Sequence, residues 1–110
     1  MTLRAASMLN VVERMIRERV SEPVTVSMLS SAVGLSRSHF SRAFHKVAGE
    51  PPRAYISRLR VERAMSLVRE GDIRLGEIAL VAGFADQAHF SNAFRRVTGA
   101  TPSQWRKSLT

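Results

Sequence analysis

The side chains of this 110-residue chain that could take part in binding are mainly the cationic groups of Arg and Lys, amides and hydroxyls. They form no recognisable nucleophile–base set and no metal site. Cys is absent, which excludes disulfides, thiol nucleophiles and cysteine-bound zinc. The three histidines, His39, His45 and His89, lack the spacing of metal ligands, and the chain contains no paired carboxylates and no Gly-rich phosphate loop. The sequence therefore predicts no enzyme, no metal and no cofactor.

Positive charge is spread over the whole chain. Lys and Arg total 17 against 9 Asp and Glu, a formal net charge of +8. Residues 1–55 hold 8 basic and 4 acidic side chains and residues 56–110 hold 9 and 5, so each half carries +4. A polyanion is the natural partner of such a surface, although charge alone could equally serve solubility. No apolar run approaches the roughly 20 residues of a membrane span, and a signal peptide is not recognisable, so we expect a cytoplasmic protein with no membrane partner.

The chain contains an internal repeat. Residues 38–49, SHFSRAFHKVAG, match residues 88–99, AHFSNAFRRVTG, at an offset of 50. Upstream, LSSAVGL at 29–35 matches IALVAGF at 78–84 at an offset of 49, so the second copy holds one extra residue. Each half of the chain is thus built from the same supersecondary unit.

Each copy has the spacing of a helix-turn-helix. This motif needs a small residue where two helices cross, a glycine about four residues later for the left-handed turn, and an apolar residue about six beyond that. A chance match to one such triplet is common in a helical protein, but two triplets at matching positions in a basic chain are far more specific. The triplets are Ser30, Gly34 and Phe40 in the first copy and Ala79, Gly83 and Phe90 in the second.

Periodicity and helix-capping residues predict an all-α fold with seven helices. Thr25 and Ser36 are suited to cap helices, and Thr101 begins a capping box with proline at the first helical position. Arg74 cannot cap the helix that follows it. The expected helices cover about 7–19, 26–33, 37–48, 52–70, 75–82, 86–97 and a last one from 102. One domain, residues 1–110, would then hold a helix-turn-helix at about 25–49, a connecting helix at about 52–70 and a second helix-turn-helix at about 74–99.

The helices at 37–48 and 86–97 each divide into an apolar and a polar face. Phe40, Phe44 and Val47 in the first helix, and Phe90, Phe94 and Val97 in the second, should face the core. The opposite side of the first helix presents Ser38, Ser41 and Arg42, of which Arg42 is suited to bidentate contact with guanine. The second presents Gln87 and Asn92, whose amides can pair with adenine. We assign phosphate contacts to Arg37, Lys46, Arg53, Arg95 and Arg96.

Other conspicuous side chains are expected to be structural. His39 and His89 precede the core Phe of each copy and are expected to pack or to contact the backbone instead of binding a ligand. Tyr55 and Trp105 occupy equivalent places in the repeat, just after a helix start, and should close the core instead of stacking on bases.

These motifs resemble the DNA-binding domain of the AraC/XylS transcription regulators. The likeness runs from about residue 8 to 107 and is most specific at residues 83–106, which carry GF, HFSNAF and TPSQWR in the family's order. The resemblance implies seven helices, with the third and sixth entering adjacent major-groove segments. It also implies that Gln87, Ser91 and Asn92 contact bases. The chain departs from the family at two positions. Where this chain has Asn92 the family often has a basic residue, and where it has Ser38 some small members have a large aromatic residue. The DNA sequences recognised by family members are therefore not assigned to this chain.

The implied function is a double-stranded DNA-binding regulator of bacterial type, an activator with RNA polymerase as partner. A connecting helix of about 17 residues is about 25 Å long, and with the half-widths of two lobes it approaches the 34 Å between groove openings. A monomeric domain could then bind two segments, with the second unit contributing at least as much specificity as the first. Most family members attach this domain to an effector or dimerisation module, whereas a few stand alone.

A basic helical RNA-binding or ribosome-associated protein is the alternative. It would share the charge but recognise single strands or RNA shape through exposed aromatics. Nearly all aromatics of this chain fall on expected core faces, which favours DNA.

Overall fold

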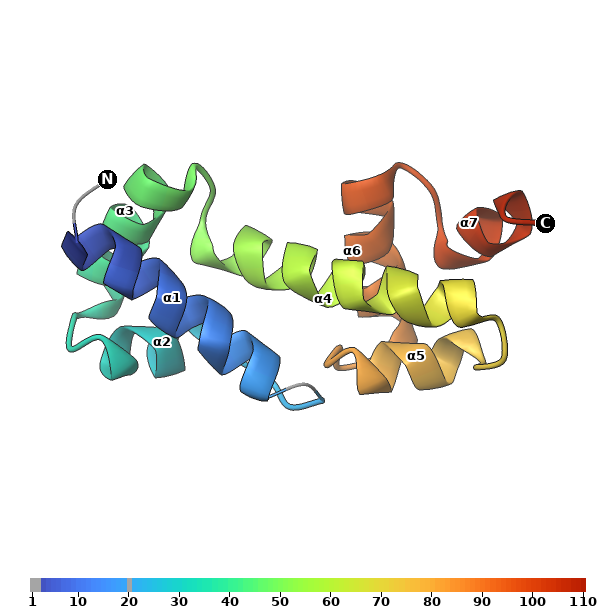
Figure 1. The fold of residues 1–110 in the computed structure, drawn as a ribbon, viewed down its shortest axis with the longest axis horizontal. Coiled ribbons are helices and arrows are strands. Elements are labelled where there is room, and N and C mark those ends of the chain that lie inside the picture. The colour runs from blue at the N-terminus through green and yellow to red at the C-terminus, as the bar shows by residue number, and fades with distance from the viewer. Residues whose placement is uncertain (1–2, 20) are drawn as a thin grey trace. The chain divides into compact units, whose positions relative to one another are not determined.

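The computed structural model describes residues 3–19 and 21–110, and the described residues form α-helices without a β-strand. This confirms the predicted all-α fold with seven helices, two helix-turn-helix units and a long connecting helix (Figure 1). The helices are α1 (Leu3–Glu18), α2 (Val26–Ala32), α3 (Arg37–Ala48), α4 (Pro52–Glu70), α5 (Leu75–Val81), α6 (Gln87–Thr98) and α7 (Pro102–Ser108).

The predicted capping residues start three of these helices. The backbone N–H of Met28 donates to Thr25 Oγ1 at 3.1 Å, and Ser36 caps α3 in the same way. Thr101 and Gln104 form a full capping box at α7, in which each side chain accepts from the other residue's backbone N–H. Side-chain acceptors at helix starts satisfy N–H groups that have no partner within the helix. These local signals explain why the boundaries agree closely with the sequence.

Two helix starts differ from expectation, and four helix ends differ by one residue. α1 begins at Leu3, four residues before the predicted start, because the helical sequence continues upstream without a proline or glycine. α6 begins at Gln87 instead of residue 86, since Asp86 is its N-cap and accepts the backbone N–H of His89 at 2.7 Å. Arg74 makes no side-chain cap at α5, as expected.

The chain divides into two compact units. The first holds the described residues up to Arg19 and Val24–Ile56, with α1, α2 and α3. The apolar face of α1 is buried at Met8, Val12 and Ile16. They share the core with three fully buried side chains, Leu29, Phe40 and Phe44. Tyr55 closes this core, with its ring edge-on to Phe44 at 5.2 Å between centroids.

The second unit holds residues 21–23 and Ser57–Thr110, and therefore most of α4 with α5, α6 and α7. Its core combines α4 with the second helix-turn-helix, and Trp105 of α7 packs edge-on to Phe94 at 5.6 Å. The predicted core role of Trp105 and Tyr55 is thus confirmed. The buried cluster consists of Val61, Ala64, Val68, Ile78, Ala79, Ala82, Phe84, Phe90, Ala93 and Phe94.

The helix-turn-helix triplets have the conformation that their spacing predicts. Ser30 and Ala79, the small residues at the helix crossings, are both buried. Gly34 and Gly83 have φ of +72° and +92°, in the left-handed region that favours glycine. The turn between the two helices of each unit is therefore set by glycine.

Val97 was predicted to face the core, and this prediction is wrong. Its side chain is 39% exposed, whereas Phe90 and Phe94 are fully buried. The core of the second unit covers the earlier turns of α6 and stops before its last turn. In the first unit the equivalent Val47 is half-buried, because α1 lies beside α3 and shares an apolar groove with it.

A buried arginine, whose packing the sequence does not indicate, holds the second unit together. Arg60 of α4 is 3% exposed and donates from Nη2 to the carbonyl oxygen of Glu22 at 2.6 Å. Burial, with Arg63 nearby, lowers the pKa of its guanidinium. A Cβ on Gly83 would come 2.7 Å from Arg60 Cζ, so this guanidinium packs directly on the turn between α5 and α6.

Candidate nucleic-acid interface

The outer face of α3 is fixed by its cap and its core residues. Ser36 starts the helix, and Phe40 and Phe44, one turn apart, anchor it in the core with ring centroids 5.6 Å apart. Residues on the other side of the helix must therefore face solvent. Ser38 and Arg42 are exposed, and Ser41 is half-buried between them.

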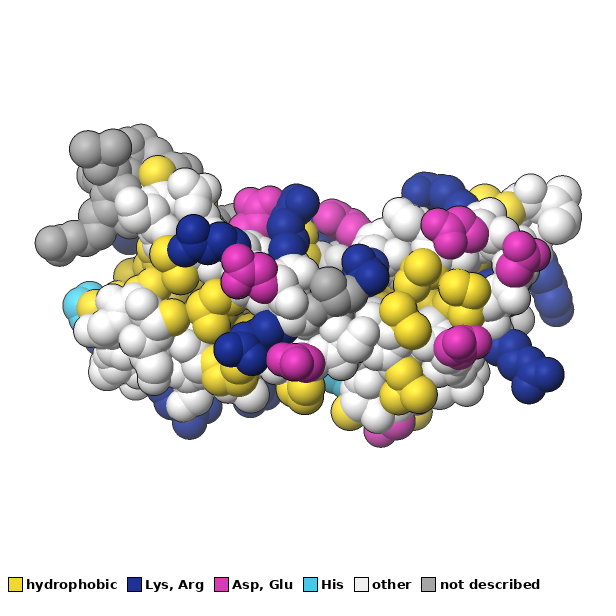
Figure 2. Space-filling view, turned by 60° about the horizontal axis from the view of Figure 1, so that its bottom comes forward, with side chains coloured by type: hydrophobic (Ala, Val, Ile, Leu, Met, Phe, Trp, Pro, Cys, Tyr) yellow, Lys and Arg dark blue, Asp and Glu magenta, His cyan; other side chains and the backbone are white. Residues whose placement is uncertain are grey.

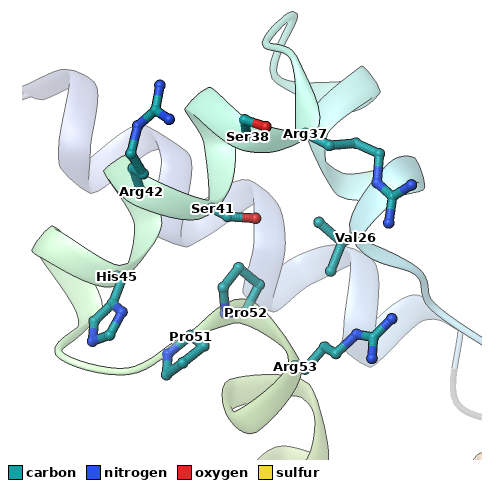
Figure 3. A pocket seen from close by; sticks show the side chains of 9 residues that line it. All are labelled: Val26, Arg37, Ser38, Ser41, Arg42, His45, Pro51, Pro52 and Arg53. Atoms are coloured by element: carbon teal, nitrogen blue, oxygen red, sulfur yellow. The ribbon is translucent and has the colours of Figure 1, made fainter.

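This face borders a cleft of about 810 Å³ in the first unit (Figure 3). The cleft lies between α3, the first residue of α2 and the start of α4, and its lining includes three arginines and a histidine but no carboxylate. Ser41 of α3 and Pro52 of α4 both line it (Figure 3). The lining side chains are Val26, Arg37, Ser38, Ser41, Arg42, His45, Pro51, Pro52 and Arg53.

Five predicted contact residues thus come together at one cleft, from α3 and from the start of α4. They are Arg37, Ser38, Ser41, Arg42 and Arg53. Lys46 does not line the cleft and lies exposed on the last turn of α3. His45, for which the sequence analysis assigned no contact, does line it, one turn after Ser41 and Arg42. Its helical spacing from Ser38 and Ser41 is the signal that could have identified it.

The side chains of the cleft can bind anions, and the cleft leaves space next to α3 for a large group. Guanidinium groups bind phosphates and the acceptor edge of guanine through two parallel hydrogen bonds. The small hydroxyls of Ser38 and Ser41 leave space for a large group to approach α3. A cleft with several positive charges and no carboxylate among its lining residues attracts a polyanion.

The outer face of α6 is built in the same way but carries amides. Phe90, Ala93 and Phe94 are buried and anchor the helix, and Asp86 caps it. The predicted contact residues lie on the remaining faces: Gln87, Asn92, Arg95 and Arg96 are exposed and Ser91 is half-buried.

Another face of the second unit has a different character. Figure 2 shows apolar side chains gathered on it, with both acidic and basic side chains around them. Carboxylates repel phosphates, whereas α6 contains no acidic residue and has Arg95 and Arg96 in its last turn. The contrast favours the basic side of α6 as the contact surface.

The two histidines that precede the core phenylalanines are exposed. Their backbone N–H groups donate to the N-caps Ser36 and Asp86, and the ring of His89 lies edge-on to Phe84 at 5.3 Å. The part of the chain that the structure describes holds no group of three or more acidic or histidine side chains that could bind a metal. Within the same residues, no helix is long and apolar enough to cross a membrane.

The fold and these surfaces define a protein with two helix-turn-helix units. A family model described as "Helix-turn-helix domain" matches residues 29–108. The transcriptional regulator ExsA of Pseudomonas aeruginosa is 37% identical over 82 residues, 74% of this chain and 30% of ExsA. The virulence regulon transcriptional activator VirF of Yersinia enterocolitica is 33% identical over 94 residues, 86% of this chain and 35% of VirF. The chain thus spans about a third of the length of these curated relatives.

Solved structures share the fold over nearly the whole chain. The DNA-binding domain of AdpA, solved in complex with a target DNA, superposes with a TM-score of 0.84 at 27% identity, covering 93% of this chain and 91% of that one. An AraC-type regulator from Chromobacterium violaceum has a TM-score of 0.81 at 27% identity, with coverage of 94% and 92%. The chain belongs to the AraC-type helix-turn-helix family, a family of DNA-binding transcription regulators. The resemblance found in the sequence is confirmed.

Proposed function

We propose that this chain is a sequence-specific, double-stranded DNA-binding domain of a transcription regulator, and that α3 and α6 enter two successive major-groove segments. The observation that carries the proposal is the cleft beside α3, where three arginines and two serines meet without a carboxylate. A major groove accommodates one α-helix, and its openings on one face of the duplex recur about every 34 Å. α4, with 19 residues, is about 28 Å long and suits a spacer on that scale.

Base contacts are proposed for six side chains. Arg42 would pair with guanine O6 and N7, and the amides of Gln87 and Asn92 would pair with adenine. Because Ser38, Ser41 and Ser91 are small, their contacts would be weaker and partly through water. On this basis α6 contributes at least as much specificity as α3.

Phosphate contacts are proposed for the surrounding cations. They fix the position of the protein on the duplex without selecting a sequence. His45 joins this set because it lines the same cleft as Ser41 and Arg42. The predicted members are Arg37, Lys46, Arg53, Arg95 and Arg96.

The wider assignment rests on the family. We propose one AraC-type domain over residues 1–110, with helix-turn-helix units at about 25–49 and 74–99 and a linker helix at about 52–70. The domain would be monomeric and act in the cytoplasm, either alone or within a longer chain carrying an effector or dimerisation module. VirF is named a transcriptional activator, which favours activation and RNA polymerase as a partner. No catalytic role is proposed.

Selection of bound duplexes from a random pool tests the proposal. We expect an enriched motif with two conserved segments about one helical turn apart, 10 to 10.5 base pairs. Competition against single-stranded and double-stranded RNA of the same length separates the two nucleic-acid classes. Failure to enrich any duplex, together with preferential RNA binding, would overturn the proposal and support the RNA-binding alternative.

A further inference from the structure

Gly76 does not have the positive φ that would require glycine at its position. Five of the six glycines in the chain have positive φ, and Gly76 is the exception. It is the second residue of α5, where alanine would stabilise the helix more than glycine does. The backbone of residue 76 thus does not require glycine, and the space around it shows what the missing side chain leaves room for.

That space is taken by the side chain of Gln87. A Cβ on residue 76 would come 3.3 Å from Oε1 of Gln87. Apart from its chain neighbours and the backbone of its own helix, Gly76 has no other heavy atom within 4 Å of that Cβ position. Since 3.3 Å is tighter than most Cβ contacts, an alanine at residue 76 would require the carboxamide of Gln87 to shift by a few tenths of an ångström.

Gln87 begins α6 and is exposed to solvent. An amide pairs bidentately with adenine only when its plane is correctly oriented. An exposed glutamine otherwise samples several rotamers, and fixing one of them reduces affinity for the base. The first turn of α5 offers a surface against which the carboxamide can rest before DNA arrives.

We propose that Gly76 is a positioning residue for Gln87. By lacking a side chain, Gly76 lets the carboxamide lie against the first turn of α5, and this placement sets the base preference of α6. The inference rests on the proposed function, in which Gln87 contacts a base. The placement of the Gln87 carboxamide against α5 is a property of the free protein and can be tested without DNA.

The first unit provides a matched control. The second residue of α2 is Ser27, and α3 begins with Arg37 in place of a glutamine. Ser27 is exposed, and its contact with Ser30 is made through its backbone oxygen. Ser27→Ala therefore changes the same helix position without altering the surroundings of Gln87.

The first experiment follows the side-chain NH₂ resonances of Gln87 in the free protein by NMR. Gly76→Ala should shift them, while Ser27→Ala should leave them in place. The melting temperature of Gly76→Ala should equal or exceed that of the unchanged protein, because alanine favours the helix. Unshifted NH₂ resonances in Gly76→Ala would overturn the inference, whatever happens with DNA.

The second experiment measures affinities for a selected duplex and for its single-base-pair variants. Gln87→Ala identifies the base pair whose preference depends on Gln87. Gly76→Ala should lower discrimination at that base pair by about threefold or more, and have no further effect in the Gln87→Ala background. Affinity for random duplex should not change.

The possible failures are distinguishable. If Gln87→Ala lowers discrimination at a base pair but Gly76→Ala does not, the positioning role of Gly76 is wrong and the base contact stands. If Gln87→Ala leaves every preference intact, the base contact of Gln87 in the proposed function is itself wrong, and the inference falls with it.

Discussion

The guanidinium of Arg60 packs against the backbone of Gly83, where a Cβ would lie 2.7 Å from Arg60 Cζ. The same guanidinium donates to the carbonyl oxygen of Glu22 at 2.6 Å. Gly83 also has φ of +92°. The turn between α5 and α6 therefore requires glycine for two reasons, its backbone conformation and the close approach of a buried charge.

Gly83→Ala should destabilise the protein more than the equivalent change in the first unit. A left-handed alanine costs about 1 to 2 kcal/mol, and displacing Arg60 from its hydrogen bond adds to this, giving about 2 to 4 kcal/mol in all. Gly34 has φ of +72° but no heavy atom near its Cβ position, so Gly34→Ala should cost only about 1 to 2 kcal/mol. The free energies of unfolding in urea test this. Equal losses in the two variants would show that the contact with Arg60 does not contribute.

Substitutions of Asp86 should separate its capping role from its charge. The carboxylate accepts the backbone N–H of His89 at 2.7 Å at the start of α6. Asp86→Ala removes this cap and should lower the free energy of unfolding by about 1 kcal/mol. Asp86→Asn keeps an acceptor and should cost less. Both variants remove a negative charge close to the proposed contact surface, so both should bind random duplex more tightly at low salt, as measured by fluorescence anisotropy. Tighter binding by Asp86→Ala alone would contradict the charge explanation.

Much of this fold could be predicted because its signals are local. Thr25 and Ser36 act as caps because a hydroxyl before a helix start can accept a nearby N–H, whatever the rest of the chain does. Phe40 and Phe44 are buried because helical spacing places them on one face. The internal repeat transfers the same reasoning to the second unit.

The remaining features depend on contacts between residues far apart in the sequence. Arg60 is buried because Gly83, 23 positions later, leaves space for its guanidinium and because Glu22 offers a carbonyl oxygen. Periodicity also placed Val97 in the core, yet Val97 is 39% exposed and does not belong to the buried cluster of the second unit. Spacing within one helix identifies a face, but not what covers it.

Two substitutions of Arg42 should distinguish base contact from simple charge. Arg42→Ala should cost about 1 to 3 kcal/mol on a selected duplex and relax the preference at one or two base pairs. Arg42→Lys keeps the charge but loses the planar fork that forms two hydrogen bonds, so it should retain affinity for random duplex while losing discrimination. Affinities for selected and random duplexes at one salt concentration check both. A parallel loss on the two duplexes in Arg42→Ala would assign Arg42 to phosphate.

Substitution of Arg96 should weaken binding to every duplex alike. A side chain that neutralises one phosphate releases about one counterion, so Arg96→Ala should flatten the slope of log affinity against log salt by about one. Arg14 is the matched control, because it lies exposed on α1 beside Glu18 and outside the proposed contact surface. Arg14→Ala removes the same charge and should change the slope much less. The measurement is the salt dependence of binding for selected and random duplexes. If Arg96→Ala and Arg14→Ala give the same slope, Arg96 does not contact a phosphate and the DNA-facing side of α6 must be reassigned.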